Sequence, residues 1–310
     1  MVSDSRVVGD TRVPRPDARV GRGCDDRWVP VLSSSTTVDA PQRLVAGVVR
    51  DGAAAAEALT LAGHRYSASV RLLIPGDEVV LRARMAPGVR IPFHSRIRAV
   101  GPEGMTSELV GGLARSLVHT TTLRPQGSGT VLHDEIVWTS PLGPLGGLGD
   151  AVLVRRLIRE MLAARSVVYR RRAEELAAAP VVVGAAIVRS GAVLAAQRDR
   201  PAELAGRWEL PGGSVERGES EAAALARECR EELGAVVAVG ARLGTDLPIT
   251  VRGQERVLRV RGATLGEGSA EPRALEHRAV RWLTAGELPT VAWVEADRAL
   301  VPDLRSLVGG

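Results

Sequence analysis

The sequence predicts an α+β protein built from two domains, and three observations lead to this prediction. The chain has 310 residues, which is more than one hydrophobic core usually organises. Between residues 66 and 138, apolar and polar residues alternate and turn residues recur, a pattern typical of an antiparallel sheet. A long helical repeat follows, and after residue 181 strand and helix patterns alternate as in an α/β sandwich.

Composition sets the expected domain limits. Residues 1–27 are rich in Arg, Asp, Gly and Pro and lack the apolar stretch of a signal peptide, which indicates a disordered leader. We expect a first domain at 28–176, a linker at 177–180 and a second domain at 181–310.

Charge and cysteine content narrow the classes of partner. All 41 cationic residues are arginine, but the net charge is only +5, so we do not expect a nucleic acid polymer as partner. Cys24 and Cys229 have neither disulfide nor metal-site spacing, which favours a cytoplasmic protein. No run of 18 apolar residues predicts a membrane span, and the oligomeric state stays open.

The first domain reads as one strand, two helices, a long antiparallel meander and a long last helix. Asp51-Gly52 separates the two helices, because both residue types interrupt a helical pattern. Gly and Pro clusters at 75–77, 86–88, 101–104 and 127–129 divide the meander into strands. The expected ranges are a strand at Trp28–Val38, helices at Gln42–Arg50 and Ala53–Ala62, strands within Tyr66–Trp138, and a helix at Asp150–Leu176.

This order of elements resembles the START/Bet v 1-like helix-grip superfamily (SRPBCC). Gly129-Thr130, Asp134-Glu135 and Pro141-Leu142-Gly143 are similar to its polyketide-cyclase branch. The resemblance implies a sheet wrapped around the last helix and a cavity for a hydrophobic small molecule. It assigns no ligand-binding residue. A catalytic role stays open beside the commoner structural one for the histidines His64, His94, His119 and His133.

The second domain begins with a predicted hairpin. Its two strands, Val181–Val188 and Ala192–Gln197, join at Ser190-Gly191. Beyond them, we expect a helix at 220–233, strands at Ala238–Leu243, Arg256–Ala263 and Ala279–Trp282, and a helix within Ala296–Val308.

The helix at 220–233 has clear ends and an apolar side. Ser220 is a good N-cap, Glu221 complements the helix dipole in the first turn, and Gly234 suits the C-terminal end. Residues at helical spacing should pack inward, namely Ala222, Leu225, Ala226, Cys229 and Leu233.

Glu228, Glu231 and Glu232 share one face of this helix and repel one another. A hard cation reverses that repulsion, because Mg²⁺ prefers carboxylate, water and phosphate oxygens. Arg227 can hydrogen-bond a carboxylate, and Glu219 is its expected partner. The preceding pair Gly212-Gly213 lets a backbone carbonyl approach such an ion. A charged, solvated helix is the alternative interpretation.

The complete spacing is more specific than the acidic helix alone. It runs Gly213, five residues, Glu219, seven residues, Arg227-Glu228, an apolar residue and one further residue, Glu231-Glu232, one residue and Gly234. This spacing resembles the Nudix hydrolases, which form an α/β/α sandwich. The stretches 196–198, 206–213, 276–277 and 281–283 look like the MutT branch, which includes 8-oxo-dGTP and (d)CTP pyrophosphohydrolases.

The resemblance implies a role for each matching residue. Glu231 or Glu228 would be the general base, assisted by Arg227 and Glu219. Mg²⁺, or Mn²⁺ in its place, would bind Glu228, Glu231, Glu232, Glu276 and the carbonyl of Gly212 or Gly213. The substrate would contact Arg198, Trp208, Leu210, Trp293 and Asp297.

The implied reaction cleaves a nucleoside triphosphate to a monophosphate and pyrophosphate, as in the removal of 8-oxo-dGTP or (d)CTP. The sequence leaves the base and the sugar open. Two alternatives remain: hydrolysis of another nucleoside diphosphate derivative, and a non-catalytic nucleotide sensor joined to a hydrophobic-ligand domain.

Overall fold

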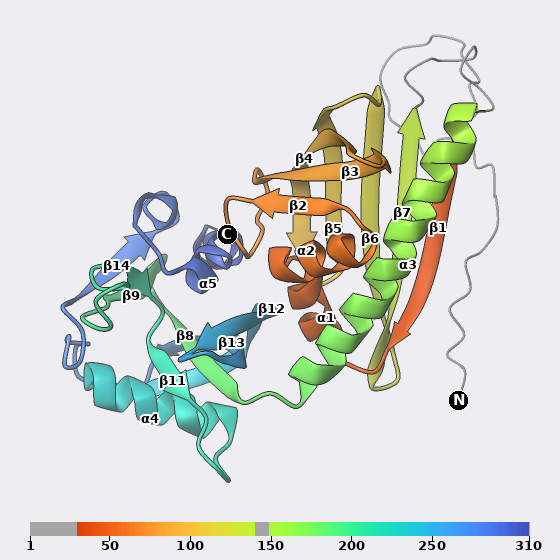
Figure 1. The fold of residues 1–310 in the computed structure, drawn as a ribbon. Coiled ribbons are helices and arrows are strands. Elements are labelled where there is room, and N and C mark those ends of the chain that lie inside the picture. The colour runs from red at the N-terminus through yellow and green to blue at the C-terminus, as the bar shows by residue number, and fades with distance from the viewer. Residues whose placement is uncertain (1–29, 140–148, 310) are drawn as a thin grey trace, which may run out of the picture. The chain divides into compact units, whose positions relative to one another are not determined.

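The computed structural model describes residues 30–139 and 149–309. The chain divides into two compact units between Glu174 and Glu175 (Figure 1). The expected leader at 1–27, Trp28 and the Pro141–Gly143 stretch lie outside the described residues.

The first unit contains a seven-stranded antiparallel sheet with the strand order β1-β7-β6-β5-β4-β3-β2. Neighbouring strands from β2 to β7 are consecutive in sequence, so this part is the meander that the turn spacing predicted. The strands are β1 Val31–Val38, β2 Arg65–Ala68, β3 Glu78–Ala86, β4 Val89–Gly101, β5 Gly104–Gly111, β6 Ser116–Gln126 and β7 Gly129–Thr139.

Three helices accompany this sheet: α1 Gln42–Val49, α2 Gly52–Leu61 and α3 Gly149–Ala177. The Asp51 side chain caps α2 by accepting a hydrogen bond of 2.9 Å from the Ala53 amide, because helix N-termini leave donors without partners. The long helix α3 packs Ile158 and Leu162 against Ile136 and Trp138 of β7. The apolar side of α3 thus lies on the sheet.

The histidines of the first unit mostly make local structural contacts. His64 Nδ1 accepts a hydrogen bond of 3.1 Å from the Arg84 amide, and His133 Nδ1 lies 2.9 Å from Ser35 Oγ. His94 lies on β4, and His119 contacts Asp134. His119 also lines a cavity of the first unit.

The second unit is a mixed sheet with helices. The path β10-β9-β8-β13-β12 is extended by β11 on β8 and β14 on β9, and β13 runs parallel to β8. The elements are β8 Val181–Arg189, β9 Ala192–Gln197, β10 Trp208–Glu209, β11 Gly212–Ser214, α4 Glu221–Leu233, β12 Val237–Val251, β13 Gln254–Leu265, β14 Ala279–Thr284, α5 Glu295–Arg298 and α6 Val301–Val308.

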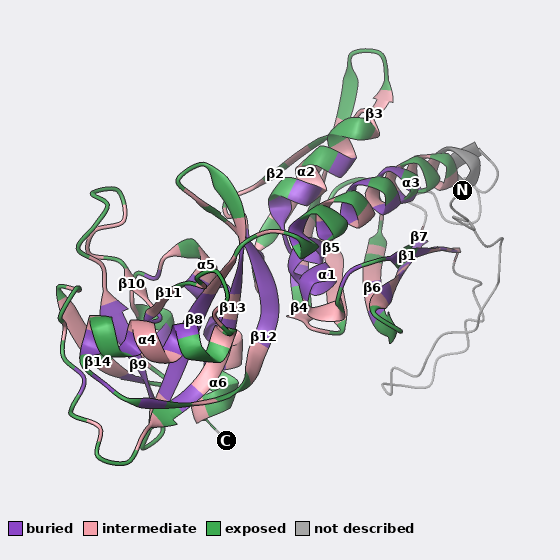
Figure 2. Cartoon of the chain, turned by 90° about the horizontal axis from the view of Figure 1, so that it is seen from below, coloured by how far each residue is buried: buried purple, intermediate pink, exposed green. Residues whose placement is uncertain are grey.

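Helix α4 buries one side against the sheet. Leu225, Cys229 and Leu233 share a core with Val183 of β8 and Ala263 of β13, and buried residues gather on β8, β9 and part of α4 (Figure 2).

The expected inward position of Ala222 is wrong. Ala222 is exposed and Ala224 is buried in its place. Glu221 bonds to Arg242 and Arg259 on β12 and β13, and these bonds set the orientation of the first turn of the helix.

Two other segments differ from the sequence prediction. The expected helix within Ala296–Val308 is two helices, α5 and α6. Pro302 starts the second one, because proline lacks an N–H and clashes with the preceding helical turn. The short strands β10 and β11 escaped prediction, since Pro211 and two glycines interrupt any alternating pattern there. Within the described residues, no helix has the length and apolarity needed to cross a bilayer.

The core position of α4 leads to a stability prediction. Leu225→Ala should lower the free energy of unfolding of the second unit by about 2–5 kcal/mol, because it leaves a cavity at a fully buried site. Leu275→Ala is the matched control, since Leu275 is 58% exposed. Chemical denaturation followed by tryptophan fluorescence measures both. Equal costs would contradict the packing described here.

Candidate functional site: the acidic face of α4

Two expected caps hold α4 in place. The Ser220 hydroxyl accepts a hydrogen bond of 3.2 Å from the Ala223 amide, and Gly234 ends the helix with φ of +65°. A left-handed φ at this position favours glycine. Because both ends of the helix are fixed, Glu228, Glu231 and Glu232 have defined positions beside β11.

Arg227 links the carboxylates of this face. It donates two hydrogen bonds of 3.1 Å to Glu219, the partner expected from the sequence. It also donates to Glu228 Oε1 at 2.9 Å and to Glu231 Oε2 at 3.0 Å. The hydrogen bond to Glu219 is the largest cause that raises the pKa of Arg227 above its usual value. One guanidinium thus holds three carboxylates that would otherwise repel.

Two glutamates of the face carry raised pKa values. Burial raises the pKa of Glu228, although Arg227 opposes the shift. Burial also raises the pKa of Glu232 to about 7, against the lowering effects of His277 and of the Gly212 amide. That amide donates to Glu232 Oε2 at 2.9 Å. Burial therefore makes the charged form of both carboxylates costly at this site.

These residues fit a hard divalent cation by their chemistry. Carboxylate oxygens with raised pKa values gain from a nearby positive ion. A Cβ at Gly213 would overlap the Glu228 carboxylate, so only glycine leaves room for it there.

In the structure, the side chains expected to bind the metal ion do not point to one common position. Within residues 30–139 and 149–309, no three His, Cys, Asp or Glu side chains are grouped closely enough to hold a metal ion. Glu231 is 52% exposed and pairs with Arg227, while Glu232 is turned towards the Gly212 amide. Glu276 is exposed, although the amide of its neighbour Leu275 donates to the Glu232 carbonyl at 3.0 Å.

His277 lies near Glu232 in place of its neighbour Glu276. Its Nε2 lies 3.2 Å from Glu209 Oε1 and 4.0 Å from Glu232 Oε1. Burial would lower the pKa of His277, but the Glu209 hydrogen bond and the Glu232 charge raise it above its usual value.

Sequence reasoning did not single out Glu209 or His277 as site residues. A signal was available for Glu209, because it is an ionisable residue placed between the apolar residues Trp208 and Leu210.

The expected substrate residues gather around β10. Arg198 forms an ion pair with Glu209, and the Leu210 amide donates to Asp297 Oδ1 at 3.4 Å. Trp208 lies on β10 itself and is half-buried. Burial, followed by the charge of Glu209, raises the pKa of Asp297 to about 8. At neutral pH this side chain holds its proton.

Trp293 is placed differently from the other expected substrate residues. It is 5% exposed, and its indole Nε1 donates to the Leu288 carbonyl at 2.6 Å. Its backbone segment also runs beside Trp208, since the Trp208 amide donates to Ala292 O at 2.9 Å. Trp293 thus supports the β10 segment through packing and offers no unbonded indole N–H.

The raised pKa of Asp297 predicts a pH-dependent stability. An unfolded chain releases this proton near pH 3.8, whereas the folded chain keeps it to about 8. The free energy of unfolding should therefore fall as pH rises through this window, by at most about 1.4 kcal/mol per pH unit. Asp297→Asn should lose this decline, as measured by denaturation at several pH values. Parallel curves for the two proteins would refute the assignment.

Comparison with known proteins agrees with the site. The family model described as the NUDIX domain matches residues 178–304. “Putative 8-oxo-dGTP diphosphatase 2” of Mycobacterium tuberculosis is 53% identical over 133 residues, which cover 42% of this chain and 91% of that protein. “CTP pyrophosphohydrolase” of Escherichia coli is 35% identical over 126 residues, or 41% of this chain and 91% of that protein.

A solved structure of the E. coli ORF135 protein is 34% identical, covers 41% of this chain and 89% of that chain, and has a TM-score of 0.36. The sequence matches extend along nearly the whole length of the curated relatives, and they include the acidic face of α4. The chain therefore belongs to the Nudix hydrolases.

Proposed function

We propose that the second unit is a Mg²⁺-dependent nucleoside triphosphate pyrophosphohydrolase, which releases a nucleoside monophosphate and pyrophosphate. The observation that carries this proposal is the acidic face of α4, with three carboxylates on one arginine beside the Gly212-Gly213 turn. The names of the relatives support 8-oxo-dGTP or (d)CTP as the substrate class.

Glu228, Glu231, Glu232 and Glu276 would hold Mg²⁺ or Mn²⁺, together with the carbonyl of Gly212 or Gly213. When bound, the ion supplies charge neutralisation along the phosphate chain and lowers the pKa of a water. Glu231 or Glu228 takes the proton of the attacking water. The exposure of Glu231 supports it for this role, because its side chain is 52% exposed and that of Glu228 is 16%.

Arg227 positions these carboxylates, since it bonds to Glu219, Glu228 and Glu231. Arg198 breaks its ion pair with Glu209 and contacts a phosphate or the base of the substrate. Most of the acceleration comes from positioning and charge neutralisation, as in other phosphoryl transfers.

The base lies against Trp208 and Leu210 and reaches Asp297. A protonated Asp297 both donates and accepts a hydrogen bond, so its carboxyl group complements the amide edge of a base. Both 8-oxoguanine and cytosine present such an edge, and a substrate panel decides between them. Trp293 does not contact the base; it packs in the interior and supports the β10 segment.

For the whole chain we propose domains at 28–176 and 181–310, joined by a linker at 177–180, in a cytoplasmic protein. A second candidate function belongs to the first domain, which we propose to be a helix-grip domain that binds a hydrophobic small molecule. A cavity of about 270 Å³ within the first unit favours it.

Glu231→Gln and Glu232→Gln test the proposed site. Each should lower turnover by about 10³-fold while the fold survives, because each removes a carboxylate needed for proton transfer or charge balance. The measurement is Mg²⁺-dependent pyrophosphate release from a panel of normal and oxidised nucleoside triphosphates. Glu267→Gln is the matched control, since Glu267 is exposed and lies in the turn after β13, not on α4.

Near-normal turnover in both variants would reject the site. Orthophosphate as the sole product would contradict the cleavage position and favour a different nucleotide reaction. Nucleotide binding without pyrophosphate release would support the non-catalytic sensor.

Metal binding should also be visible without any reaction. Mg²⁺ should raise the unfolding temperature of the second unit, because it binds the folded carboxylates and not the unfolded chain. Glu228→Gln combined with Glu232→Gln should remove most of this rise, and EDTA should reverse it in the unsubstituted protein. An equal rise in the double variant would place the ion elsewhere.

A further inference from the structure

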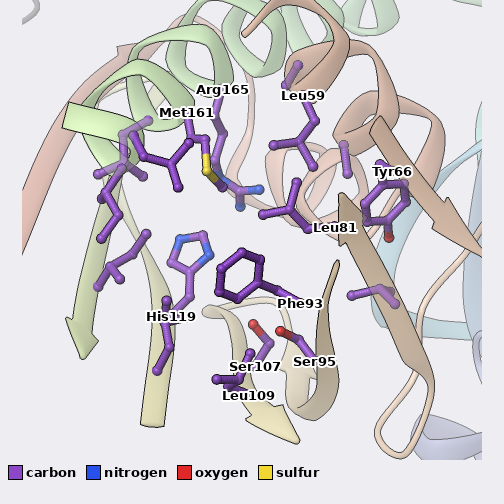
Figure 3. A pocket seen from close by; sticks show the side chains of 18 of the residues that line it. Leu59, Tyr66, Leu81, Phe93, Ser95, Ser107, Leu109, His119, Met161 and Arg165 are labelled. Atoms are coloured by element: carbon purple, nitrogen blue, oxygen red, sulfur yellow. The ribbon is translucent and has the colours of Figure 1, made fainter. Parts of the chain in front are cut away.

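The cavity of the first unit is almost wholly apolar. It has a volume of about 270 Å³ and is lined by α1, α2, α3 and the strands β2 to β7 (Figure 3). Leu59, Leu81, Phe93 and Met161 contribute typical wall residues. Such a surface favours an apolar molecule over water.

One charged side chain enters this apolar space. Arg165 extends from α3 into the cavity, near the ring of His119. Its side chain is only 11% exposed. A buried guanidinium is costly unless it is paired and hydrogen-bonded, so its presence here requires an explanation.

Part of the explanation is the buried pair that Arg165 makes with Asp134. Arg165 Nε donates to Asp134 Oδ2 at 3.1 Å, and Asp134 Oδ1 accepts from Thr121 at 2.6 Å and lies 2.9 Å from His119 Nε2. Burial would raise the pKa of Asp134, but Arg165 and these hydrogen bonds hold it well below its usual range. The pair is therefore ionised and neutral overall.

The pair does not use all the donors of Arg165. A guanidinium carries five N–H groups. Asp134, Thr121 and Tyr169 accept from Nε, Nη2 and Nη1, and no other acceptor contacts Arg165 within the described part of the chain. Two N–H groups of a cavity-lining residue therefore remain for a ligand.

A second polar side chain of the cavity lining carries a group that the described part of the chain leaves without a partner. The Tyr66 hydroxyl is buried and has no hydrogen-bond partner in the described residues. Tyr66 lines the same cavity. A buried hydroxyl without a partner carries the full cost of lost hydration, which a bound polar group would offset.

We propose that this cavity binds an apolar molecule through a neutral carbonyl oxygen that accepts hydrogen bonds from Arg165. The inference rests on the proposed ligand-binding function of the first unit and specifies the chemistry of its ligand. The oxygen is an acceptor, because a guanidinium only donates. It is neutral, because Asp134 already balances Arg165 and a second carboxylate would bring an unpaired negative charge into the apolar cavity.

Three probes of matched shape test the proposal on the full chain: 2-acetonaphthone, 2-ethylnaphthalene and 2-naphthoate. Equilibrium dialysis measures their affinities. The ketone should bind about tenfold more tightly than the hydrocarbon, since a hydrogen bond to a charged donor is worth about that factor. The naphthoate should bind more weakly than the ketone.

The substitution that tests the anchor is Arg165→Met combined with Asp134→Asn, which leaves neither charge buried alone. The preference for ketone over hydrocarbon should then disappear, while the hydrocarbon still binds. Arg156→Met is the matched control on the same helix, because the Arg156 side chain is 75% exposed. It should bind all three probes as the unsubstituted protein does.

A spectroscopic measurement needs no substitution. The infrared carbonyl stretch of ¹³C-labelled 2-acetonaphthone should move to lower frequency on binding than in an apolar solvent, because a hydrogen bond weakens the C=O bond. A stretch like that in apolar solvent would overturn the anchor even if the double variant fails to fold.

The other outcomes are equally distinct. Equal binding of ketone and hydrocarbon would overturn the carbonyl anchor and leave a ligand-binding unit. Tighter binding of naphthoate would overturn the choice of a neutral oxygen. Binding of no probe would overturn both the anchor and the ligand-binding function of the first unit.

Discussion

The arrangement of the second unit depends on one electrostatic constraint. Carboxylates must lie close together on α4, and their repulsion must be balanced by Arg227. The apolar side of the helix cannot relax away from this repulsion, because Leu225, Cys229 and Leu233 are fully buried against the sheet. Burial raises the pKa values of Glu228 and Glu232, so their charged forms lack the solvation that water would give them. A cation bound between them would supply that stabilisation, which is what makes the face suited to a cation and a polyphosphate.

Arginine holds several oxygen acceptors at once in both units. The chain has no lysine, and its 41 cations are all arginine. Arg227 uses its planar fork to hold Glu219, Glu228 and Glu231 on the acidic face. Arg165 uses the same fork to hold Asp134, Thr121 and Tyr169 at the apolar cavity. A lysine has fewer donors and no planar fork, so it could not replace either one without loss of directed bonds.

The predictable part of the molecule is the part whose residues interact locally. The meander of the first unit follows from its turn residues, and the limits of α4 follow from Ser220 and Gly234, whose caps the structure contains. The contact between Arg227 and Glu219 was also predictable, because Glu219 lies two residues before α4 and Arg227 lies in its second turn. In contrast, Ala224 is buried in place of Ala222 in the first turn, where Glu221 bonds to Arg242 and Arg259 from far along the chain.

By itself, the sequence determined the Nudix spacing, the residue types of the acidic face and the helix that displays them, since these depend on the 3.6-residue repeat and on nearby caps. Only the tertiary structure decided that His277 lies between Glu209 and Glu232. It also decided that the Trp293 indole is bonded in the interior, and that Arg165 pairs with Asp134 at the wall of an apolar cavity. The physical reason is distance along the chain. Sheet pairing brings these residues together across tens of positions, and burial then sets the pKa values of Glu232 and Asp297.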